Sequence, residues 1–273
     1  MTDKNKKQPQ KKGVAPKFFT IRADLSNKVN NTLIFSGVMF LLGVWSLIVV
    51  LFPSPNIPAP WAVIASIPSL HFEEALVRNL GYSIKLNILG YLVAIAISLP
   101  IGFLIGLFPI VKGMFNKPID ALRFLPLTAC TGLFISWFGI YDGMKVYFLA
   151  FGITVYLLPM VVQRVSEVPV VYEQTVRTLG ADRWQTIRMV FIPQAMAKLS
   201  DDIRVVVAIS WTYIIVAELA NKTGGIGAMI NSLGRQSHVD KVFAVLIIII
   251  IIGIVQDKAL KMLDRFLFPH KYA

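Results

Sequence analysis

Residues 33–52 read LIFSGVMFLLGVWSLIVVLF, a run of twenty residues without a charged side chain. At about 1.5 Å per residue, an α-helix of this length spans about 30 Å, the thickness of the hydrocarbon core of a bilayer. The run is longer than the apolar part of a cleavable secretory signal, and about thirty mostly polar residues precede it. We therefore predict that it is retained as the first transmembrane helix.

The composition extends this interpretation to the whole chain. The protein has 273 residues, of which 56% are hydrophobic and only 15% are charged, and its mean hydropathy is +0.67. A soluble domain of this length does not have enough interior to bury so many apolar side chains. The excess apolar surface is expected to face lipid, so we predict an all-α integral membrane protein.

Further apolar stretches predict about six transmembrane helices in all. The predicted spans lie near residues 33–52, 86–108, 122–141, 146–163, 203–219 and 242–258. Pro100 should kink the second span. The third and fourth flank the turn Tyr141-Asp142-Gly143 and form a helical hairpin. The uncharged cores of the last two spans are too short to cross a bilayer. These helices must therefore include the flanking charged residues, whose side chains either reach toward the membrane surface or face other helices.

The positions of the basic residues orient the chain. The net charge is +12, and with the N-terminus inside, most of the 27 Lys and Arg residues lie in cytoplasmic segments. Six lie outside, namely Arg78, Lys85, Lys145, Lys222, Arg235 and Lys241. The positive-inside rule then places both termini in the cytoplasm and accounts for the charge without a nucleic-acid partner. The basic tail, residues 1–30, is predicted to be disordered, with contact to anionic membrane lipid as the alternative.

The cytoplasmic segment 169–193, PVVYEQTVRTLGADRWQTIRMVFIP, is more organised than a connector between two spans requires. Residues 171–179 have a helical composition, and Glu173 and Arg177 are spaced i,i+4 in the order that favours an ion pair. Gly180 follows and supplies the left-handed conformation that ends many helices.

A second helix is predicted to begin directly after this turn. Asp182 with Gln185 is typical of a capping box, and Trp184 belongs to the apolar side of the helix that follows. Pro193 should interrupt that helix at its return to the membrane. An amphipathic helix pair lying flat on the bilayer is the alternative interpretation of the same residues.

The spacing of Glu173, Gly180 and Val190-Phe191-Ile192-Pro193 resembles the signature loop of ABC importer permeases, in which Glu-Ala-Ala, Gly and Ile-x-Leu-Pro recur at these intervals. Other segments are similar to the nitrate, sulfonate and taurine branch of type I importers. They are Phe52-Pro53-Ser54-Pro55, Trp137-Phe138-Gly139-Ile140, Thr178-Leu179-Gly180-Ala181 with Arg183-Trp184, and Ala217-Glu218-Leu219 before Gly225-Ile226-Gly227. The chain departs from the pattern at Gln174 and Thr175, where the family has two alanines, and this alters the close packing expected there.

This resemblance implies a type I ABC importer permease fold in the inner membrane, with a cytoplasmic coupling helix that docks on an ATPase. The coupling residues that it assigns are Glu173, Gln174, Thr175, Gly180, Ala181, Arg183, Trp184 and Pro193. It also implies a second permease copy in a homodimer, two ATP-binding cassette subunits that hold ATP and Mg, and an extracytoplasmic solute-binding protein. The cargo would be a small solute such as nitrate, a sulfonate or taurine.

The chain itself is predicted to be no enzyme and to hold no cofactor or metal. Its sequence contains no Gly-x-x-x-x-Gly-Lys-Ser/Thr phosphate loop, and Gly224-Gly225-Ile226-Gly227 is interpreted as a re-entrant turn on the outer side. The single cysteine, Cys130, excludes an intrachain disulfide.

Polar and aromatic residues inside spans are the candidates for the translocation pathway. They are Thr128, Thr131, Ser136, Trp137, Ser210, Trp211, Tyr213 and Glu218. Each has a structural alternative, because Ser and Thr in membrane helices often bond to backbone and Trp often anchors at the interface. Glu218 is an ionisable group near a span end, and it could instead pair with Lys222 and brace the outer loop.

Two other classes of protein compete with this interpretation. An ion-coupled secondary transporter would need intramembrane carboxylates and repeat-related broken helices, and the sequence shows no internal repeat. A membrane-embedded hydrolase or transferase would need a nucleophile or metal constellation, whereas His71, His238 and His270 are scattered outside the span cores.

Overall fold

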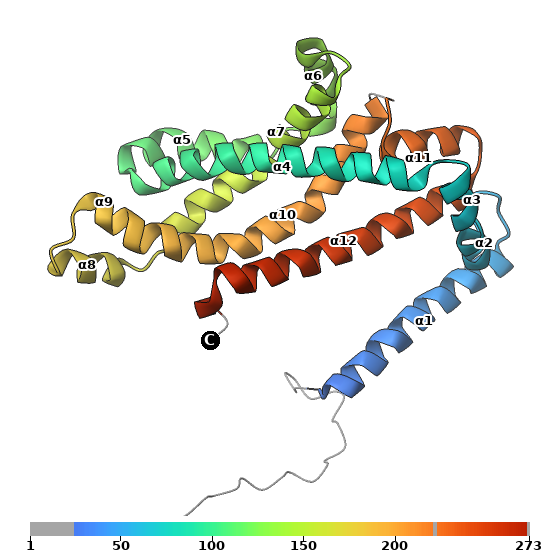
Figure 1. Ribbon diagram of the computed structural model, residues 1–273, viewed down its shortest axis with the longest axis horizontal. Coiled ribbons are helices and arrows are strands. Elements are labelled where there is room, and N and C mark those ends of the chain that lie inside the picture. Colours follow the sequence, from blue (N-terminus) through green and yellow to red (C-terminus); the bar gives the residue numbers. More distant parts are fainter. Residues whose placement is uncertain (1–24, 221–222, 272–273) are drawn as a thin grey trace, which may run out of the picture. The chain divides into compact units, whose positions relative to one another are not determined.

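The computed structural model describes residues 25–220 and 223–271, and within these ranges the chain forms helices joined by short turns (Figure 1). The α-helices are α1 (Asn27–Leu51), α2 (Pro60–Ala65), α3 (Ile67–Phe72), α4 (Leu76–Leu107), α5 (Pro109–Leu122), α6 (Thr131–Phe138), α7 (Asp142–Ser166), α8 (Val170–Thr178), α9 (Arg183–Thr186), α10 (Ile192–Ala220), α11 (Ile226–Arg235) and α12 (Val239–Leu267). Two 3₁₀ turns, η1 (Leu127–Cys130) and η3 (Pro269–Lys271), and one π-helical turn, η2 (Ile187–Phe191), complete the list.

The chain divides into two units, residues 1–60 and 61–273. In the first unit, α1 begins at Asn27, where the Ser26 hydroxyl accepts a hydrogen bond from the Val29 amide at 3.5 Å. The last four residues of the predicted tail are therefore helical, and the rest of it lies mainly outside the described residues. Near the end of the unit, the Trp45 indole donates to the Pro58 carbonyl at 3.1 Å.

The core of the second unit lies between α4, α7 and α10, three long helices packed along one another. Leu86 and Ala94 of α4, Leu157 of α7, and Leu199 and Ile214 of α10 are all at most 2% exposed. In Figure 1, α8 and α9 lie at one end of these helices and α11 at the other. The unit therefore has two structured ends joined by rigid apolar helices.

Small residues let α4 and α7 approach closely. Gly90, Ala94, Ser98, Gly102 and Gly106 recur every four residues, and so lie on one face of α4. A Cβ atom at Gly102 would lie 2.5 Å from the Cβ of the facing valine of α7, and those at Gly90 and Gly106 would meet α7 side chains at 2.7 Å. Stripes of small residues are a common means of packing helices inside membranes.

We expect Gly102→Ala to destabilise the protein, because the added methyl group overlaps Val161 and forces α4 and α7 apart. Gly81→Ala in the same helix is the matched control, since nothing lies within 4 Å of its added Cβ. Thermal unfolding of the detergent-solubilised protein should show a loss of about 1–3 kcal/mol for the first variant only. Equal melting temperatures would mean that this contact is not close-packed in the membrane.

Five of the six predicted spans are confirmed as long helices. They are α1, α4, α7, α12 and a 38-residue helix, Arg183–Ala220, that contains α10, and each is long and apolar enough to cross a membrane. The last two helices continue beyond their uncharged cores, and charged side chains that border these cores pair with one another, as Arg204 of α10 does with Asp257 of α12 at 2.7 Å.

Residues 122–141 form a broken element and not the continuous span that was predicted. The axes of α5 and the η1–α6 segment differ by 90°. Pro126 lies at the break, where it caps η1 and lacks an amide to continue a helix. The eight residues of α6 rise only about 12 Å, less than half of the hydrocarbon core. This region is a bent span or a re-entrant segment, so the described residues hold five helices that are long and apolar enough to cross a membrane, or six if the bent pair is one span.

Candidate functional site

The predicted first helix of the loop is confirmed as α8. It begins after Pro169, and Arg177 pairs with Glu173 at 2.7 Å across one turn. Thr175 faces a small cavity of about 180 Å³ between α8 and the start of α10, and its hydroxyl donates to the Val171 carbonyl at 2.8 Å. The hydroxyl that replaces a family alanine is thus satisfied by its own helix.

The turn after α8 is a Schellman motif centred on Gly180. The Gly180 amide donates to the Arg177 carbonyl and the Ala181 amide donates to the Val176 carbonyl, both at 3.0 Å. Gly180 has a φ of +88°, a left-handed conformation that other residues adopt at a cost. The prediction that glycine ends this helix is confirmed.

The capping box at the start of α9 is confirmed as well. The Gln185 amide donates to the Asp182 carboxylate at 2.7 Å, and the Asp182 amide donates to the Gln185 side-chain oxygen at 2.8 Å. These reciprocal bonds satisfy two amide groups that a helix start would leave unpaired. The turn between α8 and α9 is therefore specified on both sides by local hydrogen bonds.

The prediction that Pro193 interrupts the second helix is wrong. Through η2, α9 continues into α10, and Pro193 is the second residue of α10 within one unbroken helix. In a π-helical turn the hydrogen bonds shift to i→i+5, so the α-helical ladder is already rearranged before the proline, and its missing amide is tolerated there. The loop is thus joined without a break to a membrane-spanning helix.

The predicted coupling residues lie together on the outside of this helix–turn–helix. Those with exposed side chains or backbone are Gln174, Thr175, Gly180, Arg183, Trp184 and Pro193, and Glu173 and Ala181 are half-buried. Leu179 is 83% exposed and Trp184 is 67% exposed, although both are apolar. Large exposed apolar side chains beside a rigid turn are typical of a surface that binds a protein partner.

One group of the predicted pathway residues lies on η1 and α6. Thr128, Ser136 and Trp137 are exposed, and Thr131 is half-buried with its hydroxyl bonded to the Thr128 carbonyl at 2.7 Å. An aromatic series connects this group to Tyr213 of α10. Its ring pairs, with centroid separations of 5.7, 5.3 and 6.5 Å, are Trp137 with Phe134, Phe134 with Phe148, and Phe148 with Tyr213.

The other predicted pathway residues are buried between helices. The Ser210 hydroxyl pairs with the Asn87 side chain of α4 at 3.0 Å, and the Trp211 indole donates to Gln256 of α12 at 2.9 Å. Asn87 was not predicted, because an uncharged polar residue inside an apolar run gives a weak sequence signal. These contacts hold α10 against its two neighbours.

Glu218 is fully buried at the end of α10, where it accepts hydrogen bonds from the Ser83 hydroxyl at 2.6 Å and the Gly227 amide at 2.8 Å. Ser83 in turn accepts from the Ile226 amide at 2.9 Å. The carboxylate therefore braces the turn that precedes α11. The alternative partner Lys222 lies outside the described residues.

Lys145 holds the other side of the same turn. Its ammonium group is fully buried and donates to the Thr223 hydroxyl at 2.9 Å, the Gly224 carbonyl at 3.4 Å and the Tyr82 hydroxyl at 3.2 Å. Tyr82 also donates to the Asp142 carboxylate. From the sequence, Lys145 is one of the six basic residues expected outside the membrane. No spacing rule relates Lys145 to Gly224, which only the tertiary structure brings together.

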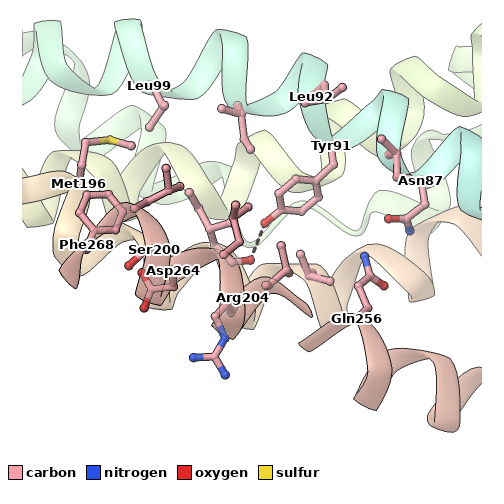
Figure 2. A pocket seen from close by; sticks show the side chains of 17 residues that line it. Asn87, Tyr91, Leu92, Leu99, Met196, Ser200, Arg204, Gln256, Asp264 and Phe268 are labelled. Atoms are coloured by element: carbon pink, nitrogen blue, oxygen red, sulfur yellow. Dashed lines mark hydrogen bonds between the residues drawn. The ribbon is translucent and has the colours of Figure 1, made fainter. Parts of the chain in front are cut away.

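A cavity of about 400 Å³ lies between α4, α10 and α12 (Figure 2). Aliphatic side chains such as Leu92, Leu99 and Met196 form most of its wall, and the Tyr91 hydroxyl at its edge donates to the Ile203 carbonyl at 2.6 Å. Polar groups, among them Asn87, lie along its margins. An anion needs several converging donors, which a largely apolar wall of this kind does not provide.

Taken together, apolar spanning helices and a rigid helix–turn–helix at one end define an all-α membrane transport protein with the type I ABC importer permease fold. Solved structures agree. A chain of the MetNI methionine ABC transporter, in inward-facing conformations, has a TM-score of 0.61 at 19% identity and covers 70% of this chain and 94% of that one. A chain of an amino acid ABC transporter has a TM-score of 0.56 at 20% identity, and the match covers 75% of this chain and 97% of that one.

The family model described as the binding-protein-dependent transport system inner membrane component matches residues 32–268. The taurine transport system permease protein TauC of Escherichia coli is 29% identical over 255 residues, 91% of this chain and 92% of TauC. A putative ABC transporter permease of Methanocaldococcus jannaschii is 30% identical over 191 residues, 70% and 72% of the two chains. The protein belongs to this family, and it is the membrane-spanning permease subunit of an ATP-driven importer.

Proposed function

We propose that this permease imports a small oxyanion or zwitterion of the sulfonate, taurine or nitrate class. Similar proteins support this class by their names: TauC, a putative aliphatic sulfonate permease of Bacillus subtilis at 29% identity over 209 residues, and the nitrate import permease of Synechococcus elongatus at 20% over 250 residues. The solute itself is selected largely by a separate extracytoplasmic binding protein.

The segment 169–193 is the coupling element in this proposal. The observation that carries it is the exposed apolar pair Leu179 and Trp184 on a turn fixed by a Schellman motif and a capping box. A helix pair lying flat on lipid would have no need of such a rigid turn, whereas a partner protein that pushes on the segment would require it.

The rest of the assembly follows from this assignment. Two copies of the chain form a homodimer around one pathway, each with an ATP-binding cassette subunit that binds ATP and Mg and hydrolyses the nucleotide. Both termini and the coupling segment are cytoplasmic, in agreement with the distribution of Lys and Arg. Movement of the ATPases then switches the pathway between a state open to the outside and a state open to the cytoplasm.

We assign the pathway to the half-buried and exposed side chains Thr128, Thr131, Ser136, Trp137 and Tyr213. Ser210, Trp211 and Glu218 instead stabilise helix packing, because their polar atoms already bond to Asn87, Gln256, Ser83 and Gly227. The apolar cavity of Figure 2 is not part of the pathway, since its wall suits lipid chains better than a polar solute.

Transport assays with the reconstituted complex test this function. The permease, its ATPase and its binding protein are placed in proteoliposomes, and uptake of labelled taurine, an aliphatic sulfonate and nitrate is measured with and without ATP. We expect uptake of one of them to require both ATP and the binding protein. Uptake driven by an ion gradient without ATP would support the secondary-transporter alternative, and no uptake of any of the three would refute the proposed solute class.

A further inference from the structure

Ion pairs connect the two places where the coupling segment joins the membrane helices. Arg164 lies in the last turn of α7, and Asp202 lies in the third turn of α10. The Arg164 guanidinium binds the Asp202 carboxylate with both of its arms, at 2.6 Å from Nε and 2.8 Å from Nη2. This two-point contact fixes the relative rotation of the two side chains as well as their distance.

Glu167, which directly follows α7, extends the connection. It accepts from Arg164 at 2.8 Å and from Lys198 of α10 at 3.4 Å. The hydrogen bond from Arg164 holds the pKa of the Glu167 carboxyl below its usual range. The carboxylate is therefore ionised at neutral pH, and its pairing is lost only as the pH falls below the ordinary pKa of glutamate. Arg164, Glu167, Lys198 and Asp202 form what we call the loop-base cluster.

The contact between Arg164 and Asp202 is partly shielded from water. The Asp202 side chain is 13% exposed and that of Arg164 is 29% exposed. Fully exposed ion pairs contribute little, whereas a two-armed pair with reduced access to water is stronger and directional. The two residues are 38 positions apart in the sequence and lie on different helices, so the pair is a tertiary contact.

Two places without regular α-helix lie between this cluster and the turn at Gly180. At the N-terminal side, Val168 and Pro169 lie outside any helix. At the C-terminal side, the π-helical turn η2 replaces regular α-helix. Both places lie between the cluster and the turn at Gly180. A force on α8 and α9 would bend the chain at these places unless the two helix ends behind them were held together.

We propose that Arg164 and Asp202 are positioning residues for energy coupling, which hold the ends of α7 and α10 together so that displacement of segment 169–193 moves both helices as one body. The inference rests on the proposed coupling role of that segment. In this scheme, loss of the ion pair leaves ATP binding, ATPase docking and ATP hydrolysis intact. Part of each displacement of segment 169–193 is then absorbed by bending at Val168-Pro169 and at η2. Transport per ATP hydrolysed then falls.

The test compares Arg164→Gln, Asp202→Asn and the double variant Arg164→Met/Asp202→Leu in the reconstituted complex. The double variant leaves neither partner as an unpaired charge at this position, so its folding should be close to normal. Arg123→Gln is the matched control, because Arg123 pairs with Asp120 at 2.6 Å within a single exposed helix end. Uptake, ATP hydrolysis and melting temperature are measured for each variant.

We expect all three cluster variants to hydrolyse ATP at a rate within about twofold of wild type. The amount of solute taken up per ATP hydrolysed should fall about tenfold, which corresponds to about 1.4 kcal/mol. The control should keep the wild-type ratio. A double variant with a normal ratio would overturn the inference, and so would a ratio that falls only in step with the melting temperature. These outcomes are distinct from failure of the proposed function, which would appear in the wild-type complex as uptake that does not depend on ATP.

Discussion

Replacing Glu218 with leucine is expected to lower the free energy of unfolding by about 3 kcal/mol or more. The leucine would leave the Ser83 hydroxyl and the Gly227 amide without their buried acceptor. It would also remove one of the two carboxylates, Glu218 and Asp142, whose charges interact with the buried Lys145 ammonium. The hydrogen bonds that Lys145 makes within the described residues go to uncharged groups of Tyr82, Thr223 and Gly224. The melting temperature of the solubilised permease measures the effect.

Glu218→Gln is the matched control for this prediction. A glutamine has nearly the same size, and its carbonyl can accept from Gly227 while its amide donates to the Ser83 oxygen. We expect its melting temperature to fall much less than that of the leucine variant. If both variants melted like wild type, Glu218 would not brace the turn. If both lost uptake at normal stability, Glu218 would belong to the pathway, contrary to our assignment.

Replacing Gly180 with valine is expected to reduce uptake about tenfold while membrane insertion persists. A β-branched residue at a φ of +88° is disfavoured by about 1–2 kcal/mol, which shifts the turn away from its native geometry by about one order of magnitude in population. The added Cβ itself meets nothing within 4 Å in this chain, so the expected effect comes from the backbone conformation. Uptake and co-purification of the ATPase are the measurements.

Gly180→Asn separates backbone geometry from contact with the partner. Asparagine adopts the left-handed conformation far more readily than valine, so the turn should survive. We expect the asparagine variant to keep most of the uptake that the valine variant loses. Normal uptake and ATPase binding in the valine variant would count heavily against the coupling role of segment 169–193.

The local elements of this protein were predictable because each depends on neighbours in the sequence. The apolar runs gave five of the spans, and the turn between α8 and α9 followed from Gly180, Asp182 and Gln185. The break at residues 123–126 was missed, because apolar composition does not distinguish a straight span from a bent one. The continuation through Pro193 was missed as well, because the π-helical turn that tolerates it has no simple sequence pattern.

The candidate site was predictable only in part. The coupling residues were assigned from the resemblance of segment 169–193 to the signature loop of importer permeases, and their role stays a prediction. The pathway candidates were chosen as polar or aromatic residues inside spans, and burial then divided them. Ser210, Trp211 and Glu218 bond to groups on other helices, whereas Ser136 and Trp137 are exposed. Whether a polar side chain in a membrane helix faces a solute or another helix depends on packing, which periodicity does not specify.

The sequence by itself determined that the chain is a membrane protein, roughly where its helices run, and that a capped helix–turn–helix projects between two spans. These properties follow from hydrophobicity and from hydrogen bonds over a few residues. Only the tertiary structure decided that Lys145 and Glu218 fasten the same turn, that Arg164 binds Asp202, and that small residues of α4 fit against α7. Such contacts join residues that are distant along the chain, and their energies depend on burial and on the directions of side chains, which arise only when the helices pack.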